Sequence, residues 1–352
     1  MTTFLRLLPD RDKGQALAAA CSAFRRGASS SEHTFEVEPE SFRSIPGAPF
    51  AYWIDDSTRS AFMRLPQLGV RATVGKGPDT GDDFRLLRLN WEIDRSERRW
   101  RDHPKGGRYS PFYADVYLTI DWINDGALIR LVGNMRNPGH MWRPGLTWSR
   151  RTKSALSMRV MPAGCVFADK GPALLVPSDD ASNLLAMLGL CSSAAFHRLV
   201  EVRLAAADAG RTGGVAHSFE VGIIEKTPIP DLPSDVALEM ARLTRCAWSI
   251  KRTLDSVDET SRAFVLPEAI RARVGDYDRS KLESDLASLE REINRIADQH
   301  FGFSGSQDAP LHEESSAKDL EGGDDELDDD EICTSARRRS TFLGRRGGFR
   351  SV

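Results

Sequence analysis

Apolar and polar residues alternate over short stretches in the first half of the chain, as they do in half-buried strands. Residues 4–7 and 33–39 have this pattern, and between them lies a helical stretch that Asp10 or Asp12 is placed to cap. A second short helix is predicted from Asp56. Further strands are predicted at residues 49–54, 84–93, 115–120, 165–168 and 218–225.

Helical periodicity dominates the second half. Residues 180–199 and 233–254 each carry apolar side chains near a spacing of 3.6. Residues 280–300 have a stricter stripe, in which successive apolar positions are four, three, four and three residues apart. This heptad-like spacing predicts a helix that packs lengthwise on a partner helix. The stripe consists of Leu282, Leu286, Leu289, Ile293 and Ile296.

These elements predict an α/β (α+β) fold in four segments. Residues 1–44 form a remnant strand-helix-strand segment, and residues 45–232 form a mixed-sheet domain. Residues 233–303 form a helical spacer or docking region. Residues 304–352 are an acidic and then Arg/Gly-rich tail of low complexity, which we predict to be disordered.

Charge is distributed unevenly along the chain. The formal net charge is −3, yet residues 95–171 hold 14 Lys/Arg against 6 Asp/Glu. Residues 304–352 hold 12 Asp/Glu against 7 Lys/Arg, so the tail carries much of the acid. A basic middle segment favours a polyanionic partner such as nucleic acid, with which the acidic tail would compete.

Cysteine usage and hydropathy indicate the compartment. The five cysteines are scattered without a C-x-x-C pair, which argues against a disulfide framework or a zinc cluster and fits a reducing cytoplasm. No apolar run reaches the length of a membrane span, and the N-terminus is charged too early for a signal peptide. We therefore expect a cytoplasmic protein without membrane contact.

The most basic stretch, residues 142–175, is the first candidate site. It carries two tryptophans, Trp142 and Trp148, with five Lys/Arg within residues 142–159, and it contains the segment Asp-Lys-Gly-Pro at residues 169–172. Such a cationic stretch suits the phosphate backbone of DNA, and one arginine could read a guanine; a solvated hairpin that happens to be basic is the alternative. The candidate phosphate contacts are Arg143, Arg150, Arg151, Lys153 and Lys170.

Two further segments are candidate contacts. In residues 105–109, glycines allow the backbone to approach DNA closely, and Lys105, Arg108 and Tyr109 would form a second wall of a basic cleft. A hairpin connection with surface charges is the alternative. In residues 72–84, Thr73, Lys76 and Thr80 accompany a glycine-rich turn that could cradle a phosphate. This turn lacks the Walker order, and a structured polar loop is the alternative.

The sequence offers no candidate catalytic residue and no candidate metal ligand. Asp, Glu and His residues show neither H-x-x-x-H spacing nor a convincing P-D…E-x-K frame. His197 has no partner for acid–base chemistry in the sequence. An independent hydrolase or nuclease is therefore a weak hypothesis.

A set of ordered motifs between residues 40 and 300 resembles one family. They resemble the C-terminal half of large adenine-specific DNA methyltransferases of the type IIG restriction and PglX-like phage-defence (BREX) class. The helix motif and the Pro-Ile-Pro exit are also similar to specificity subunits of type I restriction systems. The motifs are PFAYWI (49–54), DDFRLLRLNWEI (82–93), KGGRYSPFY (105–113), DWINDG (121–126), RPGLTWS (143–149), MPAGCVF (161–167), LGLCSS (188–193) and TPIPDL (227–232).

The resemblance implies a target-recognition role. Residues 45–232 would then bind double-stranded DNA, and residues 233–303 would dock on a catalytic methyltransferase half or subunit. The family's glycine-rich S-adenosylmethionine loop and its Asn-Pro-Pro-Tyr/Phe turn do not occur in the chain. Because base-flipping chemistry needs both, we expect no methylation by this chain alone and no cofactor bound to it.

Two interpretations of the missing catalytic motifs remain open. The chain is a detached specificity subunit, or it is a fragment of a longer reading frame whose catalytic half binds S-adenosylmethionine. An alternative of a different class is a protein-interaction module whose basic surface docks an acidic partner and has no DNA role.

Overall fold

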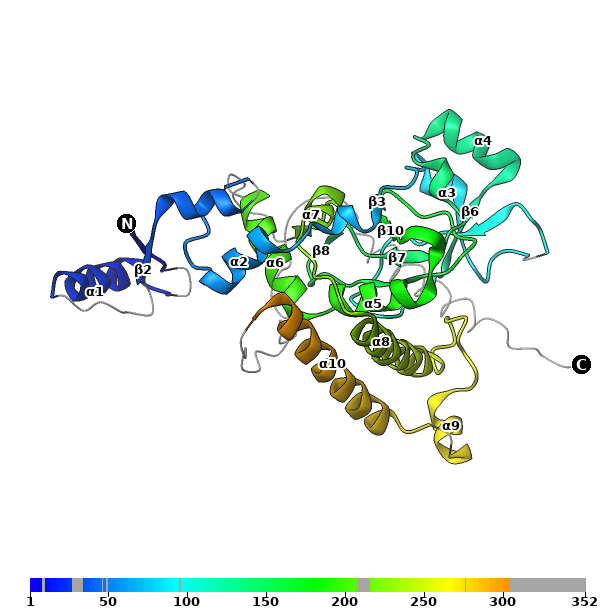
Figure 1. Cartoon of the computed structure of the whole chain (residues 1–352). Coiled ribbons are helices and arrows are strands. Elements are labelled where there is room, and N and C mark those ends of the chain that lie inside the picture. Colours follow the sequence, from blue (N-terminus) through cyan, green and yellow to red (C-terminus); the bar gives the residue numbers. More distant parts are fainter. Residues whose placement is uncertain are drawn as a thin grey trace, which may run out of the picture.

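The computed structural model describes residues 1–7, 10–26, 34–45, 47–48, 50–94, 96–207, 216–275 and 277–303. The predicted disordered tail, residues 304–352, lies outside the described residues. Helices and small antiparallel sheets make up the described part, which confirms the α+β class (Figure 1). The only parallel pairing there is an isolated bridge between Phe112 and Arg159.

A four-stranded antiparallel sheet forms the centre. Its order is β3 (Thr73–Gly75), β10 (Ala173–Leu175), β7 (Gly145–Thr147) and β9 (Arg159–Met161). Leu174 pairs with Val74 on one side and Leu146 on the other. Because β3 lies about 100 residues before β10, with which it pairs, this sheet draws distant loops together at its ends. A two-stranded ladder, β8 (Arg151–Thr152) with β11 (His217–Ser218), extends from it.

A second, smaller lobe lies beside the central sheet. It contains a three-stranded antiparallel sheet and two helices, which appear at the upper right of Figure 1. Arg262, in the connection after α8 (Ser234–Asp255), donates to the Asp102 carboxylate at 2.5 Å and ties this lobe to the helices. The elements are α3 (Asp83–Leu86), β4 (Leu87–Leu89), β5 (Trp100–Asp102), β6 (Leu118–Asp121) and α4 (Ile123–Val132).

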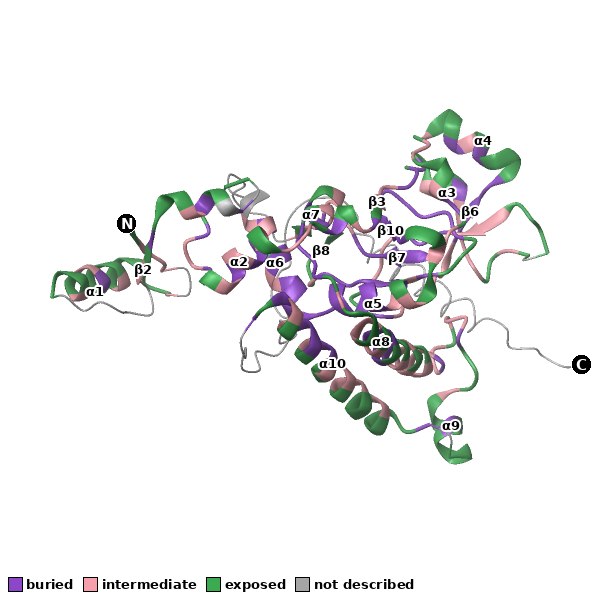
Figure 2. Cartoon of the chain, viewed as in Figure 1, coloured by how far each residue is buried: buried purple, intermediate pink, exposed green. Residues whose placement is uncertain are grey.

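Helices cover one face of the central sheet. In α5 (Ala181–Cys191), Gly189 permits close contact with α8, since a Cβ there would lie 2.5 Å from the Met240 sulfur. In α10 (Arg279–Phe301), the predicted stripe packs inward, with Ile293 and Ile296 buried. The helices α5, α8, α10 and α6 (Ala194–Ala207) share one hydrophobic core with the strands, and residues on both sides of position 232 contribute to it (Figure 2).

The N-terminal unit is smaller and more exposed. Strands β1 (Thr2–Leu5) and β2 (Thr34–Val37) pair antiparallel, and α1 (Lys13–Arg25) lies between them in the sequence. The N-cap of α1 is Asp12, as predicted. Phe4 stacks on Tyr52 with ring centroids 4.6 Å apart, which attaches the unit to the segment before α2 (Asp56–Arg64). In Figure 2 this unit and α9 (Glu268–Val274) show mainly exposed residues.

Several predicted strands are wrong. Residues 50–54 form a turn, residues 165–168 belong to no strand, and residues 84–93 divide into α3, β4 and a turn. The predicted strand at 218–225 is mostly α7 (Val221–Glu225), because a short apolar run has no periodicity that separates a buried strand from a buried helix.

The predicted helix over residues 180–199 is two helices. Asp180 caps α5 as an N-cap, with its carboxylate accepting from the Asn183 N–H at 2.6 Å. The break falls at Ser192 and Ser193. The Ser193 hydroxyl donates to the Leu190 carbonyl and accepts from the Phe196 N–H, so the serine ends one helix and caps the next.

Among the described residues, no single helix combines the length and the apolar composition of a membrane span. Only α5 and α6 taken together reach the length and composition of a span, across a bend of 64°.

Candidate nucleic-acid interface

Four loops converge at one end of the central sheet. The Gly77 N–H donates to the Ala168 carbonyl at 3.1 Å, and the Ala168 N–H donates to the Pro104 carbonyl at 3.2 Å. The Arg150 N–H donates to the Lys170 carbonyl at 3.0 Å. These bonds join all three segments that the sequence proposed as DNA contacts. We call residues 76–80, 104–108, 149–153 and 168–171 the basic loop cluster.

Glycine is required where two of these loops meet. A Cβ at Gly77 would lie 1.7 Å from the Phe167 carbonyl oxygen, and a Cβ at Gly171 would lie 2.6 Å from the Pro104 carbonyl oxygen. Both distances are far below van der Waals contact. The glycine-rich turn thus serves close backbone packing between loops.

A chain of ion pairs runs through the cluster. Asp169, which is buried, pairs with Arg136 and, at 3.0 Å, with Arg150. Glu220 pairs with Lys76 at 2.7 Å and lies 3.8 Å from the Arg150 guanidinium. Burial raises the pKa of Glu220, but the two cations outweigh it and hold that pKa below its ordinary value. Three cations face two carboxylates, so the network keeps a positive balance.

Lys105 and Thr80 are occupied within the fold. The Lys105 ammonium and the Thr80 hydroxyl both contact the Asp83 carboxylate in α3. Burial raises the pKa of Asp83, and these two partners outweigh that effect and lower it. Thr80 is only 5% exposed, and its hydroxyl holds the start of α3 through Asp83.

Three other predicted residues lie apart from the convergence of loops. Arg143 donates to the Asp179 carboxylate at 2.8 Å and to the Val176 carbonyl at 2.9 Å, beside the start of α5. Thr73 is exposed in β3 opposite Leu175. Tyr109 is 42% exposed, and partial burial together with Glu290 of α10 raises its pKa, which places it toward the helices.

Four predicted cations offer exposed side chains on the cluster. Arg108 and Lys170 lie in its loops, and Arg151 and Lys153 lie in and just after β8. The Arg108 carbonyl accepts from the buried Arg159 guanidinium at 3.1 Å, so Arg159 stabilises the loop from beneath. The network residues Arg136, Asp169 and Glu220 were missed, because their partners lie far away in the sequence and leave no local signal.

The two tryptophans of the basic stretch have different roles. Trp148 is fully buried, and its indole N–H donates to the Phe219 carbonyl at 2.9 Å. Trp142 is 41% exposed and meets Trp122 edge-on, with ring centroids 5.4 Å apart. Trp148 therefore fixes the cluster to the core.

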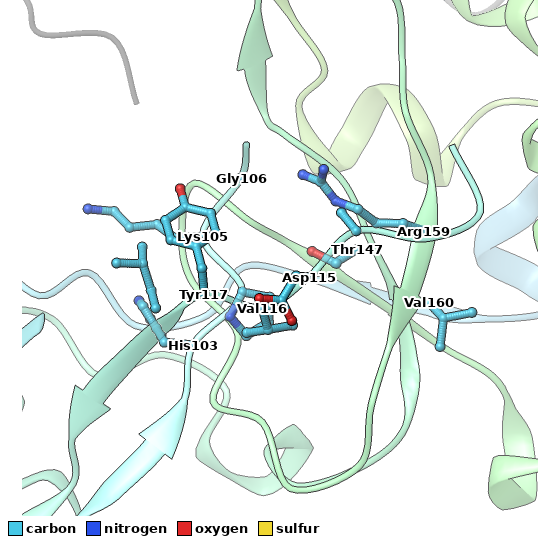
Figure 3. A pocket seen from close by; sticks show the side chains of 12 residues that line it. His103, Lys105, Gly106, Asp115, Val116, Tyr117, Thr147, Arg159 and Val160 are labelled. Atoms are coloured by element: carbon cyan, nitrogen blue, oxygen red, sulfur yellow. The ribbon is translucent and has the colours of Figure 1, made fainter. Parts of the chain in front are cut away.

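A small pocket opens at the edge of the cluster, whose residues 104–106 form part of its lining (Figure 3). His103, Lys105 and Asp115 line one part of it, and Thr147 and Arg159 of the central sheet line another. Burial raises the pKa of Asp115, and Arg262 acts in the opposite direction. Within the described ranges, no group of three or more His, Cys, Asp or Glu is arranged to hold a metal ion.

His103 predicts a pH dependence of stability. Its ring is buried, and Nδ1 lies 2.6 Å from the Val166 carbonyl, to which Nδ1–H donates. Burial and the nearby Lys105 lower its pKa from 6.5 to about 4. The unfolded chain therefore binds more protons between these values, and stability falls as the pH drops through this window.

This contribution is fully present above about pH 6.5 and amounts to ~3 kcal/mol lost by about pH 4. Urea unfolding from pH 7.5 to 4.5 measures it. His103→Gln should flatten the curve in this window relative to the wild type, whereas His217→Gln, at an exposed position, should leave its shape unchanged. Equal curves for His103→Gln and the wild type would contradict the assignment.

The comparison with known proteins agrees with the resemblance that the motifs show. No family model matches the chain. It is 26% identical over 276 residues to the adenine-specific methyltransferase BrxX of Escherichia coli O9:H4 (strain HS), a match over 74% of this chain and 22% of BrxX. The chain is homologous to BREX adenine-specific methyltransferases. This confirms the resemblance inferred from the motifs.

The second relative and a solved structure complete the comparison. The adenine-specific methyltransferase PglX of Lacticaseibacillus casei (strain Zhang) is 22% identical over 310 residues, covering 77% of this chain and 24% of PglX. The chain thus spans about a quarter of the length of these relatives. The type IIL restriction-modification enzyme MmeI, solved in complex with DNA, aligns with 12% identity and a TM-score of 0.42 over 78% of this chain and 35% of MmeI.

Proposed function

We propose that this chain recognises a site in duplex DNA as the specificity part of an adenine-specific DNA methyltransferase in a restriction-modification or phage-defence system. The similarity to BrxX and PglX over about three quarters of the chain carries the proposal. The basic loop cluster supports it, because it gathers cations from three separate segments at one end of a sheet.

The catalytic step belongs to another polypeptide segment in this proposal. S-adenosylmethionine and an Asn-Pro-Pro-Tyr/Phe turn would be supplied by a catalytic half or subunit, since the chain contains neither sequence motif. The exposed cations of the cluster would contact phosphates and set the register on DNA. Base edges would then be read by side chains held in that register.

A salt titration tests the DNA role. A labelled 30-base-pair duplex is titrated with the protein at several salt concentrations between 50 and 200 mM, in parallel with poly-glutamate as an acidic protein mimic. We expect tighter binding to the duplex and a linear fall of log K with log salt, since binding releases condensed counterions.

The competing function, docking of an acidic protein partner, predicts a different result. Poly-glutamate would then bind at least as well as the duplex. That result, or no duplex binding at 50 mM salt, would remove the DNA role.

A further inference from the structure

Phe84 is the most exposed large apolar side chain in the described part of the chain, at 85%. It nevertheless lies in a rigidly held turn. The Asp82 carboxylate accepts from the Arg85 N–H at 3.1 Å, and the Asp83 carboxylate contacts Lys105 and Thr80. Leu86, at the end of the same short helix, is fully buried. The fold therefore fixes the backbone of an aromatic residue that remains in solvent.

A second exposed apolar group comes from the neighbouring helix. Leu131 and Val132, at the end of α4, are 77% and 39% exposed. A Cβ at Gly81 would lie 2.3 Å from the Val132 carbonyl oxygen, so the turn that leads into α3 touches the end of α4. In Figure 1, α3 and α4 lie side by side at the edge of the small lobe. Phe84 and Leu131 thus come from neighbouring segments, because the turn that precedes α3 contacts the end of α4.

Cations accompany this apolar edge. Arg85 and Arg130 are exposed on α3 and α4. The Lys105–Asp83 ion pair connects α3 directly to the basic loop cluster. A protein surface that covered Phe84 would also have to desolvate these arginines. Duplex DNA suits both chemistries, because phosphates attract the cations and the faces of the bases stack on an aromatic ring.

We infer that Phe84 is a wedge that enters a base step of the bound duplex, with Arg85 and Arg130 on the adjoining phosphates. Apolar side chains inserted in this way unstack the step and kink DNA by roughly 20–90°. The inference rests on the proposed DNA role and adds a deformation of the DNA to it. The edge would also give the protein a preference for flexible pyrimidine–purine steps.

Energy transfer between dyes at the two ends of a 30-base-pair duplex with a central TA step measures the bend. Wild-type protein at 50 mM salt should shorten the end-to-end distance. Phe84→Ala should bind roughly 10-fold more weakly with the same salt slope, because no charge is removed, and should leave the duplex straight. Phe84→Trp should bend the duplex as the wild type does.

Val70→Ala is the matched control, since Val70 is 79% exposed outside this edge and should change neither affinity nor bend. Wild-type binding without shortening, or full shortening by Phe84→Ala, would overturn the wedge while leaving the DNA role intact. Absence of duplex binding by the wild type would refute both.

Discussion

Replacing Arg151, Lys153 and Lys170 together by glutamine is expected to weaken duplex binding by roughly 10²- to 10³-fold at about 0.1 M salt. These side chains are exposed on the basic loop cluster. Each phosphate contact contributes about 0.9 to the slope of log K against log salt, so the triple variant should also lower that slope by about 3. Equilibrium titrations over 50–200 mM salt measure both quantities.

A second triple variant controls for the change in net charge. Arg245, Lys281 and Arg291 are exposed on α8 and α10, and replacing them by glutamine removes the same charge from the helical face. This variant should bind almost as the wild type does. If both triples weaken binding equally, attraction is diffuse and the cluster is not the contact surface.

Lys105 is a poorer test of phosphate contact than its sequence position indicates. Its side chain is 10% exposed and holds Asp83, so Lys105→Ala would leave a half-buried carboxylate without its cation. Weakened DNA binding in that variant would therefore mix a lost contact with a displaced α3.

Trp148→Ala is expected to lower the free energy of unfolding by about 3–5 kcal/mol, the largest effect on stability that we predict. The side chain is fully buried between the central sheet and the helices, and its removal leaves both a cavity and an unpaired Phe219 carbonyl. Urea unfolding followed by circular dichroism measures the change.

Two further variants separate the causes. Trp148→Phe retains most of the apolar contact and should lose only part of this free energy, while Trp91→Ala, at a position 39% exposed, should have a small effect. Equal stability of Trp148→Ala and Trp91→Ala would contradict the assigned role of Trp148. The charge variants should unfold at the wild-type urea concentration, which distinguishes lost binding from lost folding.

Helix positions followed from the sequence because their signals are local. Asp12 caps its helix as predicted, and the stripe ending in Ile293 and Ile296 packs inward. Ser193 shows where this fails, because its hydroxyl ends α5 and caps α6 within a continuous apolar pattern. Short apolar runs such as 218–225 failed because they are too brief to show a period.

The convergence of the cationic segments could be predicted only in outline. The sequence showed that the middle of the chain is basic, but not that Arg150 lies between Asp169 and Glu220 or that Lys105 holds Asp83. These partners are brought together by sheet pairing over long sequence separations, which composition does not record. Arg143 looked equivalent to its neighbours and instead binds Asp179 beside α5.

Sequence-selective binding is the central claim, and selection from a randomised duplex library tests it most directly. Duplexes with a random central region are mixed with the protein near physiological salt, recovered with the bound protein and sequenced. We predict enrichment of one short motif by the wild type and loss of that enrichment in the Arg151, Lys153 and Lys170 triple variant. A recovered pool with the composition of the input, despite tight binding, would contradict target recognition by this chain.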